Sequence, residues 1–543
     1  MSQPFGMKTY MRGAALLTVA ALLVKILSAV YRVPFQNLVG DEGFYIYQQV
    51  YPFIAVFVVW TSGGFAVAIS KLLADNDAES SLMKREQQRQ FIMRVVFWYL
   101  VVLAAVFFSF LYFGADYLAH LMGDSELSPL LRTGSFIVWI MPAFAVVKGT
   151  FQSRGYMAPI AYAQVVEQVV RVAIILIGTA IIMKTTASLY SAGQMAVLGT
   201  VIGEAIGFGI LAFWYMRVFS KGAIDKSTIQ LPIMPIIKEV TWFSLSVSMS
   251  SLLLLSYQFV DAFTIYSLLV DSGVDKVEAK ALKGVFDRGQ PLVQLGIVIA
   301  SSLTLAIVPL IAHQTKIQAE GGRSALPFIQ LTYRTALIFG SAAAIGLIAV
   351  MPDVNIMLFK TDSESGVLAF YMLQIIPLSL VLTFTGILQG LEKLKIPALI
   401  LLLGFIVKLV INQLTIGTLG IEGAALASNI GLTITALLLL KYSKRFIPRL
   451  ANKAFHRQLL QALIIMLLAV YTTRLVMAGI GVASIRLQAL LSAFAAITVG
   501  AVVFVTVIAK ERLLSEKEWF LLPFGRRIAT YQLWLNRKKV GAK

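Results

Sequence analysis

The sequence has no cysteine, few histidines and no nucleotide-binding loop. The absence of cysteine from 543 residues removes disulfides, thiolate metal sites and thiol catalysis. The three histidines, His120, His313 and His456, lie far apart in the sequence, so we expect no metal cluster. No GxxxxGK(S/T) motif occurs, so we expect no nucleotide hydrolysis through a P-loop. Any transport must then draw on an ion gradient such as Na⁺ or H⁺, on the membrane potential or on a partner, and we expect no bound cofactor.

Charge is also scarce. Charged residues make up 13% of the chain, about half the quarter that soluble proteins carry. Apolar residues make up 58%, which leaves too little polar surface to cover a water-soluble globule. A soluble enzyme and a disordered chain are both excluded by this composition, and we expect the bilayer to be the solvent.

Long apolar runs fill most of the chain. A bilayer core of about 30 Å needs about 20 apolar residues per helix. This length predicts an all-α, polytopic membrane protein with fourteen transmembrane helices, near residues 11–36, 46–71, 91–114, 132–152, 159–183, 194–216, 238–263, 288–312, 325–351, 367–389, 396–417, 421–440, 457–477 and 485–508. Lys25 interrupts the first apolar run, so we interpret that run as an uncleaved span rather than a signal peptide.

The loops are asymmetric in charge. The net charge is +19, and most of the Lys and Arg residues fall in alternate loops, on the side that holds both termini. By the positive-inside rule this side is the cytoplasm. Acidic residues concentrate on the opposite side, at Asp41, Glu42, Asp116, Asp124, Glu126, Asp271, Asp275, Glu278, Asp353, Asp362 and Glu364. We therefore expect a multi-pass protein of the cell membrane with cytoplasmic N- and C-termini.

Weak internal repeats suggest two lobes. Phe151-Gln152, followed by Arg171, recurs as Leu388-Gln389, followed by Lys408, with the same Gln-to-cation spacing. Six helices per repeat preserve orientation, as in many secondary transporters. The predicted domains are therefore an N-lobe at 1–236, a C-lobe at 237–445, an added helix pair at 446–509 and a cytoplasmic basic tail at 510–543. The lobes would rock about a central cavity.

Five charged residues fall deep within predicted helices: Lys25, Glu167, Arg171, Glu204 and Lys408. Each costs about 2.5–3.5 kcal/mol to insert, so each needs a partner or a function. Glu167 and Arg171 are four residues apart on one helical face, which favours a structural ion pair over a coupling site. Glu204 could neutralise Lys25 or another cation. Lys25 and Lys408 have no carboxylate within a turn on their own helices, which makes them candidates for a cavity.

A second charged set lies nearer the predicted outer face. We expect Arg32 to end helix 1, Asp261 to end helix 7, and Asp287-Arg288 to open helix 8 just before Pro291. Ordinary snorkelling at the interface would explain each residue singly. Pro291 would then mark either a helix start or a break that faces a cavity. Asn412 and Asn429 are more typical of polar groups that pack helices together.

The C-terminal tail interleaves aromatic and basic residues. This pattern is typical of an interfacial amphipathic helix that binds anionic phospholipids, and it favours lipid over nucleic acid. The aromatic residues are Trp519, Phe520, Phe524, Tyr531 and Trp534, and the basic ones are Arg526, Arg527, Arg537, Lys538 and Lys539.

Several motifs resemble one bacterial family. The segments KILSAVYR at 25–32, GDEG at 40–43, QVVEQVVR at 164–171 and DRGQP at 287–291 are similar to those of the lipid-linked oligosaccharide flippases of the MurJ/SpoVB type. These polysaccharide biosynthesis proteins belong to the multidrug/oligosaccharidyl-lipid/polysaccharide exporter superfamily. The resemblance implies a MATE-like fold and a central cavity in which Lys25, Arg32 and Arg288 would receive the pyrophosphate of a lipid carrier.

The charges of the candidate site residues also favour an anionic substrate. Cavity cations at Lys25, Arg32, Arg171, Arg288 and Lys408 outnumber carboxylates at Glu167, Glu204, Asp261 and Asp287, which suits an anionic head group. We therefore expect a non-enzymatic flippase for a polyprenyl-pyrophosphate-linked sugar, either a lipid II-like peptidoglycan precursor or a polysaccharide repeat unit, with cell-wall synthesis enzymes as partners. A multidrug antiporter is the alternative, although it would need a carboxylate midway along helix 1. A membrane glycan polymerase would need a long external catalytic loop, and 264–287 has no histidine.

Overall fold

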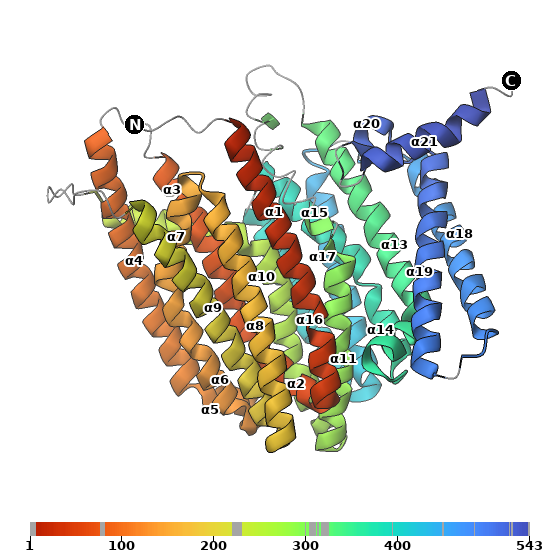
Figure 1. Ribbon diagram of the computed structural model, residues 1–543, viewed down its shortest axis with the longest axis horizontal. Coiled ribbons are helices and arrows are strands. Elements are labelled where there is room, and N and C mark those ends of the chain that lie inside the picture. Colours follow the sequence, from red (N-terminus) through yellow and green to blue (C-terminus); the bar gives the residue numbers. More distant parts are fainter. Residues whose placement is uncertain are drawn as a thin grey trace. The chain divides into compact units, whose positions relative to one another are not determined.

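The computed structural model describes residues 7–75, 82–219, 231–298, 300–302, 311, 314–315, 325–391, 393, 395–447, 450–482, 484–520, 522 and 525–540. His313 lies outside this part of the chain. The described residues form helices joined by short turns, with no strand among them, so the expected all-α class is confirmed (Figure 1). The chain divides into two compact units, Met1–Asp287 and Arg288–Lys543. The division into lobes at 236/237 rests on the repeat and stays a prediction.

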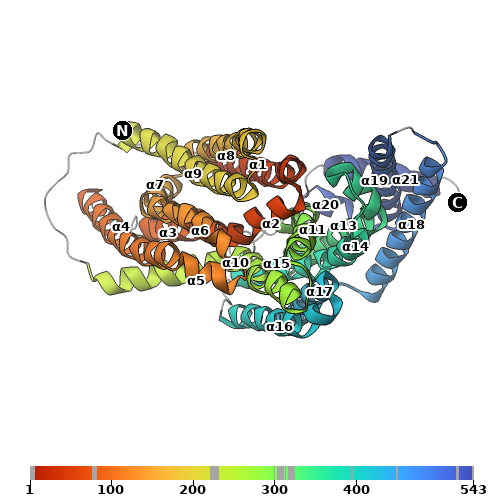
Figure 2. The ribbon, with the colours of Figure 1, turned by 90° about the horizontal axis from the view of Figure 1, so that it is seen from below.

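The first unit is built from long helices and a few short helical segments. In chain order these are α1 (Met7–Val30), α2 (Arg32–Val59), the π-helix η1 (Trp60–Phe65), α3 (Ala66–Asp75), α4 (Leu82–Phe113), α5 (Ala115–Leu121), η3 (Ser125–Leu127), α6 (Ser128–Ser135), η4 (Phe136–Ile140), α7 (Met141–Ser153), α8 (Met157–Thr185), α9 (Leu189–Phe219), α10 (Ile233–Asp271) and α11 (Lys276–Gly296). The last turns of α11 belong to the second unit. Helices α1, α8 and α9 pack together, and Figure 2 shows them side by side.

The second unit continues with helices of similar length. They are α13 (Leu326–Phe359), α14 (Ser365–Met372), α15 (Ile375–Gly390), α16 (Lys395–Leu419), α17 (Ile421–Ser443), α18 (Lys453–Ala478), α19 (Ile485–Lys510), α20 (Glu516–Trp519) and α21 (Gly525–Val540). Helices α13, α18 and α19 pack together, and α21 runs across the end of α19 (Figure 1). Many large apolar side chains of α18 and α19 point outward, among them Val476 at 65% exposure and Phe494 at 60%. Such a surface suits lipid and would be costly in water.

Twelve stretches of the described chain are long and apolar enough to cross a membrane. The longest, Val19–Asp75, has 57 residues; it contains the expected segment 46–71 and most of the expected segment 11–36. The expected segment 288–312 extends into residues outside the described part. The protein is therefore a multi-pass membrane protein, and the number fourteen stays a prediction.

Three helix boundaries differ from those expected. Arg32 begins α2 instead of ending the first helix, since α1 ends at Val30 and Tyr31 is the N-cap residue of α2. Asp261 lies within α10, which continues to Asp271. Helix α11 begins at Lys276, twelve residues before the expected start at 288, so no long external loop precedes it. The reason is that the first turns of α11 carry Lys and Glu, which lower its hydropathy although the segment is strongly amphipathic.

Candidate functional site

Two glycines bring the charged faces of α8 and α9 together. A Cβ atom at Gly203 would lie 2.8 Å from the Cβ of Arg171, and one at Gly207 would lie 2.9 Å from the Cβ of Glu167. Real Cβ atoms essentially never approach so closely, so these positions require glycine. Because α9 can lie this near to α8, Glu204, between the two glycines, reaches the charged face of α8.

The guanidinium of Arg171 joins two carboxylates. Its Nη2 donates to Oε1 of Glu167 and, over 3.0 Å, to Oε2 of Glu204. Its Nη1 donates to Oε1 of Gln168 over 3.4 Å. Glu204 and Glu167 are both buried, at 2% and 7% exposure. The expected pair of Glu167 and Arg171 is therefore part of a larger cluster, in which Glu204 also pairs with Arg171.

Lys148 completes this cluster, which we call the α7–α9 ion cluster (Lys148, Glu167, Arg171 and Glu204). It lies inside α7, is 2% exposed, and interacts electrostatically with both carboxylates. Two cations then balance two anions. The expected helix at 132–152 contains Lys148, but the sequence analysis did not single this residue out as a buried charge. A charge imbalance in the sequence could have pointed to Lys148, because two buried glutamates paired with one arginine require a second cation.

Arg32 lies in an aromatic setting at the start of α2. It is 1% exposed, and its guanidinium carbon lies 4.7 Å from the ring centroid of Tyr51. The hydroxyls of Tyr31 and Tyr47 are hydrogen-bonded to each other over 2.9 Å nearby, within electrostatic reach of Arg32. Its Nε and Nη1 make no hydrogen bond to any described residue. A buried guanidinium with donors to spare suits an anionic ligand.

Helix α11 brings a second ion pair beside Arg32. Lys283 donates to Oδ1 of Asp287 over 2.6 Å, and these residues are 2% and 0% exposed. Asp261, 1% exposed on α10, and Arg32 both act electrostatically on Asp287. Pro291 lies in the interior of α11, so it marks neither a helix start nor a first turn. Asp287 is therefore a mid-helix carboxylate, and Lys283 is a partner that the sequence interpretation missed.

The position of α11 depends on a break in α2. Gly40 has φ of 70°, in the left-handed region that glycine tolerates, and it interrupts the helical backbone of α2. A Cβ at Gly284 would lie 2.0 Å from the carbonyl oxygen of Asp41, so α11 packs directly on this break. The GDEG segment therefore shapes the backbone that receives α11.

Within the first unit, a line of buried polar groups connects the α7–α9 ion cluster with Arg32 and with the ion pair of Lys283 and Asp287. Tyr31 and Tyr47 lie within electrostatic reach of both Arg32 and Arg171. The line therefore runs from Lys148 through Arg171 and the two tyrosines to Arg32, and on to Asp287. Such a chain of ionisable and hydroxyl groups within transmembrane helices is typical of transport pathways rather than of simple packing.

The remaining predicted cations lie in three different settings. Lys25, on α1, is exposed. In the second unit, Arg288 is 1% exposed, donates from Nη1 to Oδ1 of Asn355 over 3.3 Å, and lies 5.2 Å from the ring centroid of Phe359. Lys408, on α16, is also 1% exposed, one turn before the buried Asn412. The sequence analysis did not identify Asn355 as a partner of Arg288, because a neutral amide in a helix does not stand out as a buried charge does.

Comparison with known proteins decides the family. The family model described as polysaccharide biosynthesis protein matches residues 10–314. The uncharacterized membrane protein YabM of Bacillus subtilis (strain 168) is 34% identical over 550 residues, which covers 98% of this chain and 98% of that protein. The chain belongs to the polysaccharide biosynthesis protein family. The resemblance seen in the sequence motifs is thereby confirmed.

Other relatives of the family extend this result. The lipid II flippase MurJ of Bacillus subtilis (strain 168) is 25% identical, over 78% of this chain and 80% of its own length. A solved lipid II flippase MurJ in an inward closed conformation has a TM-score of 0.68 at 14% identity, covering 92% of this chain and 99% of that one. An inward-facing MATE transporter of the MOP superfamily has a TM-score of 0.58, also at 14% identity, covering 80% of this chain and 98% of that one. The fold is therefore the one that these two solved proteins share, which confirms the expected MATE-like fold.

Proposed function

We propose that this protein is a flippase that moves a polyprenyl-pyrophosphate-linked sugar from the inner to the outer leaflet by alternating access. The observation that carries the proposal is the guanidinium of Arg32, which is buried with Nε and Nη1 free of hydrogen bonds to described residues. A buried charge with unused donors is costly unless a ligand supplies acceptors. A pyrophosphate supplies several such acceptors and the matching charge. The relationship to the flippase MurJ supports the same class of substrate.

Each predicted residue has a role in this proposal. Lys25, Arg32 and Arg288 would bind the pyrophosphate, with Arg171 and Lys408 adding positive charge to the translocation path. Glu167, Glu204, Asp261 and Asp287 would hold these cations in place or couple their movement to transport. No bound cofactor takes part, and no enzymatic step is needed.

The membrane potential is the driving force that we propose. A potential of 100 mV changes the free energy of moving one elementary charge across the membrane by about 2.3 kcal/mol. Net movement of the buried cations during the conformational cycle would therefore bias it in one direction. Coupling to Na⁺ or H⁺ is the alternative, and an ionophore that collapses the potential while leaving the Na⁺ and H⁺ gradients unchanged separates the two.

The two rival functions fit less well. A multidrug antiporter would need a carboxylate midway along the first helix, where this chain has Lys25. A glycan polymerase would need a long external loop, whereas the segment expected to form one is helical from Lys276 onward. The described geometry therefore favours the flippase over both.

The tail would bind anionic phospholipids at the cytoplasmic leaflet of the bacterial cell membrane. On α21, Arg526, Arg527 and Trp534 are exposed, as an interfacial helix requires. Trp519 does not belong to this surface, because it is 0% exposed and its Nε1 donates to Oε1 of Gln532 over 2.8 Å. Cell-wall synthesis enzymes are the protein partners that this function implies.

Depletion of the protein tests the proposed function in cells. We expect one polyprenyl-pyrophosphate-linked sugar to accumulate in the inner leaflet, because its synthesis continues while its export stops. The measurement is lipid extraction followed by mass spectrometry, with leaflet assignment by a membrane-impermeant reagent. Unchanged lipid-linked intermediates together with increased sensitivity to cationic drugs would support the antiporter instead.

A further inference from the structure

A separate polar pocket lies in the second unit, where α13 and α18 begin and α19 ends. It has a volume of about 360 Å³. Its charged lining residues are two arginines, Arg334 and Arg512, and its other lining residues are Gln330, Leu450, Ala451, Asn452, Phe455, Gln458 and Leu513. No carboxylate is among the described residues that line the pocket. A pocket of this size accommodates a small organic ligand, and the sign of its charge selects an anion.

Arg512, an exposed residue that lines the pocket, has a costly backbone conformation. Its φ is 51°, in the left-handed region that non-glycine residues seldom occupy. The amide of Arg512 donates to the carbonyl of Ala509 over 3.3 Å, and the amide of Leu513 donates to that of Ile508 over 3.1 Å. This is the Schellman arrangement that ends a helix, and its left-handed position is usually glycine. An arginine at such a position, with its side chain lining a pocket, suggests a use for the guanidinium.

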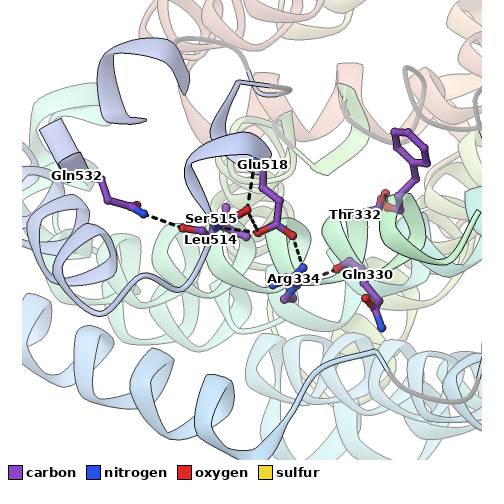
Figure 3. Close-up of polar contacts among 8 residues, drawn as sticks. Gln330, Thr332, Arg334, Leu514, Ser515, Glu518 and Gln532 are labelled. Carbon is purple, nitrogen blue, oxygen red and sulfur yellow. Dashed lines mark hydrogen bonds and ion pairs between the residues drawn. The ribbon is translucent and has the colours of Figure 1, made fainter. Parts of the chain in front are cut away.

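Two neighbouring carboxylates, Glu518 and Glu511, each accept from a residue that lines the pocket, so Arg334 is already neutralised by the protein and Arg512 is not. Glu518 accepts from Arg334 Nη2 and also from the amide and hydroxyl of Ser515, as Figure 3 shows. Glu511 accepts from Nε2 of Gln458 over 3.3 Å. The guanidinium of Arg512, in contrast, makes no ion pair within the described ranges. The pocket therefore keeps one cation whose charge is not neutralised by the protein.

Other groups complete a site for an anion. Oδ1 of Asn452 accepts from the amide of Phe455 over 2.8 Å, which leaves the amide NH₂ of Asn452 as a donor at the pocket. The planar guanidinium matches the geometry of phosphate oxygens better than an ammonium would. Leu450, Phe455 and Leu513 supply an apolar wall for the rest of the ligand.

We propose that this pocket binds a phosphate ester through Arg512 and Arg334, the ester being either the head group of an anionic phospholipid or a soluble phosphate ester. This site is distinct from the exposed basic face of α21 and from the charged clusters of the first unit. A bound phosphate would link the ends of α13, α18 and α19, and so would stabilise the docking of α20 beside them.

The test uses the full-length protein purified in detergent and titrated with three probes: short-chain phosphatidylglycerol, glycerol phosphate and inorganic phosphate. Short-chain phosphatidylcholine, which has no net charge, serves as the ligand control. We expect the anionic probes to raise the melting temperature of the wild type. Arg512→Gly should weaken their binding by about tenfold or more, because a charge-assisted contact is lost. Its fold should be as stable as the wild type, since glycine suits the left-handed backbone.

Matched variants make the result decisive. Arg512→Gln removes the charge while keeping a side chain on the backbone, so it should lose binding as well. Lys510→Gln removes an exposed cation two residues away that does not line the pocket, and it should bind like the wild type. Stabilisation by the lipid alone assigns the site to the membrane, and stabilisation by glycerol phosphate or phosphate assigns it to a soluble ester. Equal binding by wild type and Arg512→Gly, or no binding of any anionic probe, would overturn the proposal.

Discussion

Lys25→Glu is expected to abolish transport and leave the protein abundant in the membrane. Lys25 is exposed on α1, so its replacement should disturb packing little. The substitution places a negative charge where the proposed substrate brings another. A charge-assisted contact contributes about 1.5–3 kcal/mol, so its loss alone predicts transport slower by about tenfold to a hundredfold, and charge reversal predicts more. The measurement is rescue of a strain that lacks the activity, with membrane abundance determined in parallel.

The complete series at Lys25 separates charge from shape. Lys25→Arg should keep most of the activity, and Lys25→Ala should weaken it. At Arg288 the same order is expected, with Lys better than Ala and Ala better than Glu. There, however, abundance should also fall, because Arg288 is buried against Asn355 and Phe359. Lys184→Glu, at an exposed cation near the end of α8, is the matched control and should transport normally. Wild-type transport by abundant Lys25→Glu protein would refute the anionic head-group proposal.

Arg171→Met is expected to destabilise the protein by about 3–5 kcal/mol, because it strands two carboxylates that share one guanidinium. The measurement is the apparent melting temperature of purified protein. Arg154→Met is the matched control, since Arg154 pairs with Glu86 at the surface, where an ion pair contributes about 0–1 kcal/mol. Equal effects of the two substitutions would contradict a structural role of the α7–α9 ion cluster.

Charge exchange distinguishes an isolated pair from this cluster. If Glu167 and Arg171 formed a pair alone, the double variant Glu167→Arg with Arg171→Glu would recover stability. In the structure, the exchange brings an arginine toward Lys148 and a glutamate toward Glu204, so we expect no recovery. Glu167→Gln combined with Lys148→Met should recover more, because one anion and one cation are removed together. If Glu167→Gln melts like the wild type and yet abolishes transport, the carboxylate acts in coupling instead.

Local sequence patterns predicted part of the α7–α9 ion cluster. The four-residue spacing of Glu167 and Arg171 identified a pair because both residues lie on one helix, where geometry follows from sequence. The contributions of Lys148 and Glu204 come from neighbouring helices, and their approach depends on glycines such as Gly207, whose role emerges only after packing is known. Contacts between helices carry no fixed spacing in the sequence.

The helix boundaries predicted near Arg32, Asp261 and Asp287 were wrong for a related reason. A hydropathy threshold finds lipid-facing helices, whereas α11 has exposed charges at Lys276 and Glu278 and buries Lys283 and Asp287 near its middle, so its sequence looks polar. In α2, the break at Gly40 is visible in the sequence only as a glycine among several. The fold class followed from composition, because the membrane constrains total apolar length. The partners of buried charges did not follow, since each is set by tertiary packing.

Transport in proteoliposomes tests the central claim most directly. The purified protein is reconstituted with a polyprenyl-pyrophosphate-linked sugar, and the fraction of sugar that reaches a membrane-impermeant reagent outside is followed over time. We predict that this fraction rises quickly with the wild type, faster under an imposed membrane potential, and that it stays at the level of protein-free liposomes with Arg32→Gln. A wild-type protein that reconstitutes intact and leaves the sugar as inaccessible as protein-free liposomes do would contradict the account.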